Sequence, residues 1–291
     1  MVTLAFSTNG FTNDSLPEAV RQIAAHGYDG VELLADEPHA YFPTFSDSDR
    51  ADLLSALDET GLAVSNINAN TATGYYDDAP PSPFFEPSIV TDDDERRQWR
   101  IDYTKRAIDL AADTGAPAVC VATGRALPGN PPPRAYETLV ESLHELLDYA
   151  EPRGVDLGIE FEPELLIENT AETLELVEDV GRSSLGVNLD IGHAAVYGEE
   201  LTETIHQAAG HITGVHVEDI AGGRRGKHYH LIPGLGDIDF ESVFEAFDDV
   251  GYDGFVTVEL YTYRDQPHVA AEQALEALGR FVPAANPSGT E

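Results

Sequence analysis

Short apolar runs alternate with longer amphipathic stretches along almost the whole chain. The apolar runs predict eight β-strands, over Leu4–Ser7, Gly30–Leu34, Ala63–Asn68, Ala118–Ala122, Asp156–Phe161, Ser184–Asp190, Ile212–Val217 and Phe255–Leu260. The amphipathic stretches predict helices over Leu16–His26, Asp49–Thr60, Glu95–Thr114, Tyr136–Arg153, Thr170–Val180, Glu199–Ala209 and Phe240–Val250. Because strands and helices alternate, we expect parallel pairing through right-handed crossovers. An open, doubly wound sheet is the alternative, but eight strand–helix units favour a single α/β domain closed as a (β/α)₈ TIM barrel.

The residues between these elements support the same pattern. Ser15 and Glu18 predict a capping box at the start of the first helix. Glycines that follow a predicted helix and precede a predicted strand are expected to end that helix in the left-handed conformation. They are Gly27, Gly61, Gly115, Gly154, Gly210 and Gly251.

Three of the segments that lead from a strand to a helix are long, at residues 69–94, 123–134 and 218–239. In a barrel all such loops open at one end, and active sites lie there. The long loops therefore predict the functional end of the molecule. We expect the barrel to span residues 1–282, and residues 283–291 to form a flexible C-terminal tail.

The charge balance narrows the classes of partner. The chain has 53 acidic and 16 basic residues, a formal net charge of −37. Binding to nucleic acid draws on clustered basic residues, and docking on an anionic membrane needs positive charge, so neither partner is expected. Acidic residues are spread over the whole chain, and such a surface repels itself unless salt screens it. This predicts a protein from a halophile.

We expect a cytoplasmic protein. No signal peptide opens the chain, and no apolar run approaches the ~20 residues that a membrane helix needs. The single cysteine, Cys120, excludes an intramolecular disulfide, and its apolar neighbours predict a core position.

Four predicted strands end in residue types that bind metal ions: Glu160, Asp190, His216 and Glu259. The two-residue period of a strand places all four on the inward face, near the C-terminal mouth. Three carboxylates facing one another would repel unless they are protonated or bridged by a cation. The set predicts one divalent ion, Mn²⁺ or Mg²⁺ first, with Co²⁺ and Zn²⁺ as further candidates. A register slip of two would exchange two of the residues for their neighbours Glu162 and Glu218.

Four segments then carry a resemblance to a known family: Gly186–His193 (GVNLDIGH), Val215–Asp219 (VHVED), Pro233–Phe240 (PGLGDIDF) and Gly251–Leu260 (GYDGFVTVEL). They resemble the xylose-isomerase-like TIM-barrel superfamily, and the resemblance extends from about Thr3 to Arg280. That superfamily contains sugar isomerases and epimerases, inosose and 3-dehydroshikimate dehydratases, and family 2 type AP endonucleases.

The resemblance implies a role for each candidate residue. It places Glu160, Asp190, His216 and Glu259 as metal ligands, with Glu160 and Glu259 also acting as the catalytic acid–base pair. The implied activity is a divalent-metal-dependent isomerase or epimerase of a sugar, sugar acid or sugar phosphate. Such an enzyme moves a proton through an enediolate held by the ion. By the same resemblance His193 contacts the small-molecule substrate, and Glu164 is a further candidate.

The loop after the seventh strand is basic in an otherwise acidic chain. It contains Arg224, Arg225, Lys227, His228 and His230. We interpret it as a substrate-side cluster for hydroxyl, carboxylate or phosphate groups, with Arg225 and His230 as the chosen residues. The aromatic residues of the loop after the third strand either cover the substrate or anchor that loop to the barrel. They are Tyr75, Tyr76, Phe84 and Phe85.

Three other functions compete with the isomerase or epimerase. A dehydratase acting on inosose or 3-dehydroshikimate would use the same metal and the same C–H abstraction. A non-catalytic barrel would bind sugar or metal without turnover. The negative net charge disfavours an AP endonuclease. In addition, Ala35 and Asn68 occupy regions where those enzymes carry additional zinc-binding histidines. The oligomeric state stays open, a homo-oligomer included.

Overall fold

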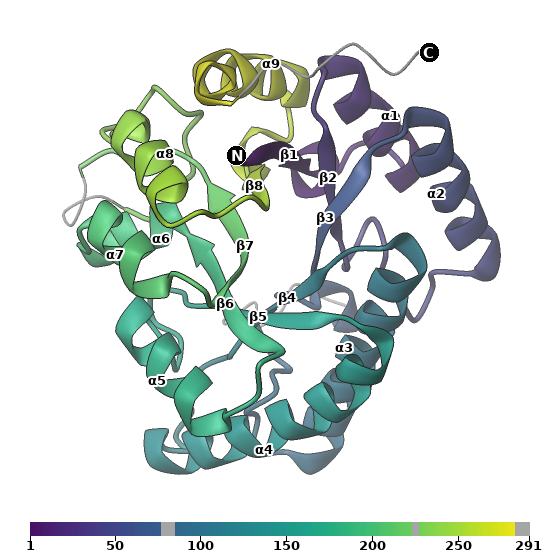
Figure 1. Ribbon diagram of the computed structural model, residues 1–291. Helices are drawn as coiled ribbons and strands as arrows, with labels where there is room; N and C mark the ends of the chain where they lie inside the picture. Colours follow the sequence, from purple (N-terminus) through teal and green to yellow (C-terminus); the bar gives the residue numbers. More distant parts are fainter. Residues whose placement is uncertain (77–84, 223–226, 283–291) are drawn as a thin grey trace.

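The computed structural model describes residues 1–76, 85–222 and 227–282. Its eight strands form one closed parallel barrel in sequence order, and β8 pairs with β1. The helices surround the barrel (Figure 1). The prediction of a single (β/α)₈ barrel is therefore confirmed, and the open sheet is excluded. The expected tail at residues 283–291 lies outside the described residues.

The strands begin and end within two residues of the prediction. They are β1 (Thr3–Ser7), β2 (Gly30–Leu34), β3 (Ala63–Asn68), β4 (Ala118–Ala122), β5 (Asp156–Glu160), β6 (Leu185–Asp190), β7 (Ile212–Val217) and β8 (Phe255–Val258). Apart from the first residue or two of some strands, their side chains are buried, because inward residues fill the barrel and outward residues meet the helices.

The main helices are α1 (Leu16–His26), α2 (Asp47–Thr60), α3 (Asp94–Thr114), α4 (Pro132–Ala150), α5 (Thr170–Val180), α6 (Ile191–Tyr197), α7 (Leu201–Ala208), α8 (Phe240–Asp249) and α9 (Pro267–Leu278). Two of them, α6 and α9, were not predicted. Helix α6 follows β6 with no turn between them, because the Asp190 side chain accepts a hydrogen bond from the N–H of His193 and caps the helix. A strand and a helix that share a boundary leave no turn signal in the sequence.

The left-handed conformation predicted for the glycines after helices is confirmed, but the predicted capping box at the start of α1 does not form. Gly27 and Gly61 adopt the left-handed conformation, with φ of 94° and 71°. Ser15 makes no capping hydrogen bond to the first turn of α1, where Pro17 removes one of the backbone donors. A complete capping box occurs instead at α2, between Ser46 and Asp49.

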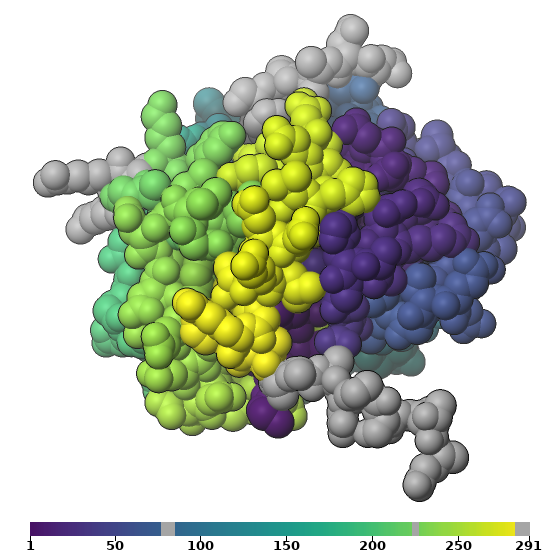
Figure 2. All heavy atoms as spheres, turned by 90° about the horizontal axis from the view of Figure 1, so that it is seen from above, coloured from purple at the N-terminus to yellow at the C-terminus, as the bar shows by residue number. Residues whose placement is uncertain are grey.

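The two ends of the chain close the barrel side by side. Figure 2 shows the C-terminal segment lying directly against the N-terminal segment. The hydroxyl of Tyr28 donates to the carbonyl of Ala271 in α9 at 2.9 Å, which ties the last helix to the start of β2. Within the described ranges, no helix combines the length and the apolar character needed to cross a membrane.

Asp219, which follows β7, organises the loop that leads to α8. Its buried carboxylate accepts hydrogen bonds from the backbone N–H groups of Ile220, Gly234, Gly236 and Ile238, at 2.8–3.1 Å. These contacts join two segments that carry the family resemblance, residues 215–219 and 233–240. The segment 234–238 is therefore held against the end of β7 at the mouth of the barrel.

Candidate active site

A cavity of about 850 Å³ opens at the end of the barrel where the strand-to-helix loops meet. This is the end that the long loops predicted. Its wall comes from the ends of β1, β2, β3, β5 and β8, from helix α6 and from the loop after β7. Its polar lining includes Asn9, Asn68, Glu160, Glu162, His193, His230 and Glu259.

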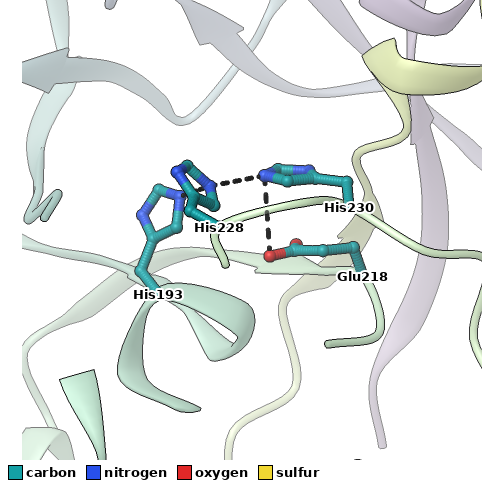
Figure 3. A group of neighbouring side chains, drawn as sticks. All are labelled: His193, Glu218, His228 and His230. Atoms are coloured by element: carbon teal, nitrogen blue, oxygen red, sulfur yellow. Dashed lines mark hydrogen bonds and ion pairs between the residues drawn. The ribbon is translucent and has the colours of Figure 1, made fainter. Parts of the chain in front are cut away.

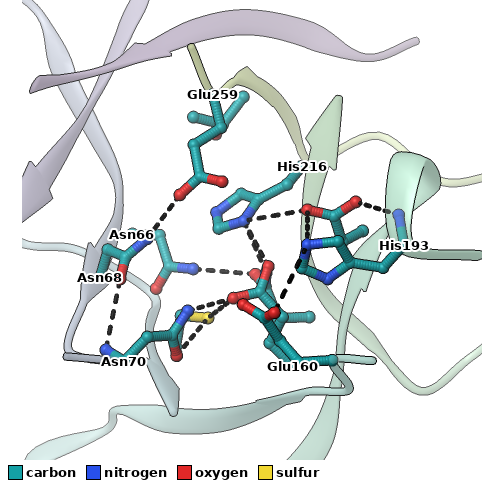
Figure 4. Close-up of polar contacts among 12 residues, drawn as sticks. Asn66, Asn68, Asn70, Glu160, His193, His216 and Glu259 are labelled. Carbon is teal, nitrogen blue, oxygen red and sulfur yellow. Dashed lines mark hydrogen bonds and ion pairs between the residues drawn. The ribbon is translucent and has the colours of Figure 1, made fainter. Parts of the chain in front are cut away.

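Three of the four predicted metal ligands each approach the fourth, His216, although the four ligand atoms do not all lie within 4.8 Å of one another. Oε1 of Glu160 lies 2.6 Å from Nδ1 of His216, and Oδ2 of Asp190 lies 3.9 Å from the same nitrogen. A carboxylate oxygen of Glu259 lies within 4.8 Å of a ring nitrogen of His216. Asp190 and His216 are register partners on neighbouring strands, which fixes their approach. Figure 4 shows the side chains of Glu160, His216 and Glu259 pointing toward one another.

The imidazole of His216 is held between two buried carboxylates. Nε2 lies 2.6 Å from Oε2 of Glu32, while Nδ1 faces Glu160. Glu32 was not among the predicted site residues, although its position on the inward face of the strand Gly30–Leu34 was a usable signal. Burial alone would lower the pKa of His216, but the charges of Glu32 and Glu160 raise it well above the ordinary range, so both ring nitrogens donate to carboxylates. If a cation took the place of the hydrogen on Nδ1, Glu32 would hold the remaining hydrogen on Nε2.

Asparagine side chains orient the two candidate catalytic glutamates. Asn68 and Asn9 each donate to Oε1 of Glu259, at 3.0 and 2.9 Å. Asn70 donates to Oε2 of Glu160. These amides were not among the predicted site residues, although Asn68 and Asn70 follow the two-residue period of β3 and its extension. Amide donors hold each carboxylate in place and favour its charged form.

The strand register places Glu160 and His216 together, without the slip of two residues. Glu162 lines the cavity together with Glu160, and Glu218 is fully buried two residues beyond His216. The additional carboxylates therefore form a second level above the first, and neither replaces its neighbour. Gly192 makes room for Glu218, because a Cβ atom at position 192 would lie 1.6 Å from Oε1 of Glu218.

The carboxylates of the site have divergent pKa values. Burial alone would raise the pKa of Glu160, but the charge and hydrogen bond of His216 lower it to about 2. Burial and the charge of Glu160 raise the pKa of Asp190 to about 7. Burial also raises the pKa values of Glu162, Glu218 and Glu259 well above the ordinary range. Each of these groups carries an unfavourable negative charge unless it takes up a proton or meets a cation.

The donor set fits a divalent cation. Oδ2 of Asp190 is buried, lies 3.9 Å from Nδ1 of His216, and accepts no hydrogen bond from the described residues. Buried polar atoms almost always have a partner, and a cation beside the imidazole would provide one for this oxygen. Carboxylate oxygens with one imidazole nitrogen are a common ligand set for Mn²⁺ and related ions.

The predicted substrate residues have different positions. His193 and His230 are buried and line the cavity. Glu164 lies at the rim, where its exposed carboxylate pairs with Arg125 at 2.6 Å. Arg225 lies outside the described residues. Burial lowers the pKa values of His193 and His230, so both imidazoles are neutral near pH 7.

Of the aromatic residues considered as a lid, Tyr75 serves as an anchor. Its ring packs on Trp99 of α3 with a centroid distance of 4.6 Å. Tyr76 packs against Tyr75, whereas Phe85 lines the cavity. Phe84 lies outside the described residues.

Cys120 is fully buried, as predicted, and burial raises the pKa of its thiol.

Comparisons with known proteins extend these observations. Residues 20–281 match the family model described as xylose isomerase-like TIM barrel. A fructoselysine 3-epimerase of Shigella flexneri is 28% identical over 281 residues, which are 95% of this chain and 96% of that protein. A ketose 3-epimerase of Arthrobacter globiformis is 26% identical over 264 residues, which are 88% of this chain and 81% of that protein.

Solved structures share the fold. A crystal structure of the IolI protein with a bound zinc atom has a TM-score of 0.78 at 20% identity. The alignment covers 97% of this chain and 100% of that one. At this level of identity the likeness shows the barrel architecture alone, so the chemistry must be argued from the residues of this chain.

Proposed function

The chain belongs to the xylose isomerase-like TIM barrel family, and we propose that it is a divalent-metal-dependent sugar epimerase. Aldose–ketose isomerisation is the related reaction that the same site supports. The observation that carries the proposal is the placement of Glu160 and Glu259 in one cavity, with Asp190 and His216 between their strands. The similarity to sugar 3-epimerases over most of the chain adds to it.

Glu160, Asp190, His216 and Glu259 would hold the ion. When bound, such an ion withdraws electron density from a carbonyl and stabilises negative charge on neighbouring oxygens. We propose Mn²⁺ or Mg²⁺ because three of the four donors are carboxylates.

The two glutamates supply the proton chemistry. One carboxylate removes the proton from the carbon beside the substrate carbonyl, and an enediolate forms. The other glutamate, as a carboxylic acid, returns a proton to the opposite face of the same carbon, which inverts that centre. Return of the proton to the neighbouring carbon would give aldose–ketose isomerisation instead. Asn9 and Asn68 hold Glu259 in position for this transfer, and Asn70 does so for Glu160.

Substrate contacts are proposed for the cavity wall above the glutamates. His193 and His230 present their rings to the cavity, and Glu164 lies at its rim. Arg225 is retained as a candidate from the sequence for a carboxylate or phosphate group of the substrate. A net charge of −37 supports a small-molecule substrate and not a nucleic acid.

The acidic composition also suggests the working conditions. We propose that the protein functions in the salt-rich cytoplasm of a halophile, where counterions screen the repulsion between acidic residues.

The proposal is tested with the variants Glu160→Gln and Glu259→Gln and a panel of ketoses, sugar acids and their phosphates. Each variant should keep its circular dichroism spectrum and lose at least about 100-fold in kcat, since one positioned acid or base contributes about 10²–10⁴. Glu178→Gln, at an exposed position of α5, is the matched control and should keep wild-type kcat.

Other outcomes identify the competing functions. Loss of water with a new conjugated absorbance would show a dehydratase. Binding of sugar without any conversion would show a non-catalytic barrel. Wild-type rates in both glutamine variants would reject the proton-transfer roles.

A further inference from the structure

Helix α3 carries a charged side chain, Arg100, that is buried in the interior. It is 1% exposed and is the largest fully buried side chain of the described residues. Its Nη2 donates to the backbone carbonyl oxygens of Ala69 and, at 2.9 Å, of Asn70. Nε and Nη1 donate to no described residue. Burying a guanidinium on carbonyl oxygens, without a carboxylate in contact, is costly, so packing alone does not explain it.

The carbonyl of Ala69 shares a peptide group with the N–H of Asn70. That N–H donates to Oδ1 of Asn68, the last residue of β3, at 3.3 Å. Hydrogen bonds in a chain polarise one another. Because the guanidinium draws electron density from the carbonyl oxygen, it makes the N–H of the same peptide group a stronger donor. The side-chain oxygen of Asn68 is therefore held by a group that Arg100 polarises.

The nitrogen of the Asn68 side chain contacts two carboxylates. Nδ2 donates to Oε1 of Glu259 at 3.0 Å and lies 3.4 Å from Oε1 of Glu32. A carboxylate accepts and a backbone N–H donates, so the contacts at both ends of the amide require the same orientation. Figure 4 shows Asn68 between Glu259 and Asn70. A continuous chain of hydrogen bonds thus leads from Arg100 to Glu259.

This chain fixes one oxygen of Glu259 and leaves the other free. Oε1 accepts from Asn68 and Asn9, whereas Oε2 accepts no hydrogen bond from the described residues. Nδ1 of His230 lies 3.6 Å from Oε2. However, this ring, shown in Figure 3, donates from Nδ1 to the backbone carbonyl of Glu259 at 2.8 Å. Oε2 therefore stays available to a metal ion or to the substrate.

We propose that Arg100 is a positioning residue for the proton transfer. It acts through the peptide group of residues 69–70 and the amide of Asn68, and it holds Glu259 with Oε1 bound and Oε2 free. This inference rests on the proposed function, because it assigns Arg100 a role in that reaction. A neutral side chain of similar length would fill the same space, but it would not polarise the peptide group.

The second carbonyl extends this role to the other glutamate. The backbone oxygen of Asn70 accepts from Arg100, and the side-chain nitrogen of the same residue donates to Oε2 of Glu160. A single guanidinium therefore holds the backbone of the segment that orients both candidate catalytic glutamates. A side chain that only filled the core would need neither a charge nor donors at this point.

A double-mutant cycle tests whether Arg100 acts through Asn68. Arg100→Met keeps most of the volume and removes the charge, and Asn68→Ala removes the amide. With saturating Mn²⁺ and the ketose that the wild type converts fastest, each variant should lose about 10-fold or more in kcat and keep its KM. The double variant should lose no more than about threefold beyond Asn68→Ala, because the chain is already interrupted. Arg106→Met, at an exposed position of the same helix, is the matched control and should keep wild-type kcat.

Losses that multiply in the double variant would overturn the inference, because independent effects combine in that way. Arg100→Lys keeps the charge and should be less impaired than Arg100→Met, and equal impairment would reject the role of the charge. If Arg100→Met does not fold, Arg100→Lys takes its place in the cycle.

A crystal structure of the folded Arg100 variant gives a result that does not depend on turnover. We expect the contact of 3.0 Å between Nδ2 of Asn68 and Oε1 of Glu259 to break. If that contact is unchanged, Arg100 does not position Glu259. Failure of the proposed function would appear differently, as a wild type that converts no member of the panel, and the crystal structure would then decide whether Arg100 orients Glu259.

Discussion

Replacing Glu32 with glutamine tests how the proposed metal site is organised. Oε2 of Glu32 lies 2.6 Å from Nε2 of His216, and both side chains are fully buried. The carboxylate holds the hydrogen on Nε2. Nδ1 can then give its electron pair to a metal ion. Glutamine has the same shape without the charge, so the ring stays in place but loses this polarisation.

The size of the effect follows from the contact that is lost. Removing a carboxylate that supports a metal-binding histidine weakens metal binding by about 10–100-fold. This corresponds to about 1.4–2.8 kcal/mol. We therefore expect the dissociation constant for Mn²⁺ to rise by this factor in Glu32→Gln, with an unchanged circular dichroism spectrum. Glu32→Ala should weaken binding further, because it also frees the ring to rotate.

The assay is a titration of chelator-treated protein with Mn²⁺, in which the signal of free Mn²⁺ is followed by electron paramagnetic resonance. Glu178→Gln is the control for the loss of one negative charge from a very acidic protein. If Glu32→Gln binds Mn²⁺ within twofold of that control, Glu32 does not support a metal-binding His216.

Three further predictions concern stability. Asp219→Ala leaves four backbone donors without their acceptor and should lower the free energy of unfolding by at least about 3 kcal/mol in urea titrations; a loss below about 1 kcal/mol would contradict the role given to this carboxylate. Gly192→Ala should cost at least about 1 kcal/mol and displace Glu218, which a crystal structure of the variant would show or disprove. Raising KCl from 0.1 to 2 M should increase the free energy of unfolding by screening the charge of −37, and a decrease would argue against a halophilic protein.

The fold was largely predictable because its signals are local. The apolar run Gly30–Leu34 became a strand with the predicted bounds, and the glycine after α1 ended that helix as expected. Helix α6 was missed because its start depends on a side chain of the preceding strand, which no turn residue marks.

The site was predictable only in part. Strand ends and the two-residue period brought Glu160 and His216 into one region, but the contact between Glu32 and His216 joins residues 184 positions apart. The position of His230 depends on the following segment 231–236, which Asp219 holds through contacts that sequence spacing does not reveal. The local pattern of apolar and polar residues therefore indicates which face of a strand each side chain occupies. The side chain that it contacts across the barrel is determined by the tertiary structure.

The most direct measurement of the central claim is the exchange of substrate hydrogen with solvent. Metal-loaded protein is incubated in deuterated, KCl-rich buffer with the ketose and sugar-acid panel, and each C–H signal is followed by NMR. We predict that deuterium enters only at the carbon beside the carbonyl, in substrate and product alike. Exchange should stop on chelation and resume when Mn²⁺ is restored. Absence of exchange across the panel, or exchange that a chelator leaves unchanged, would contradict a metal-dependent proton transfer in this cavity.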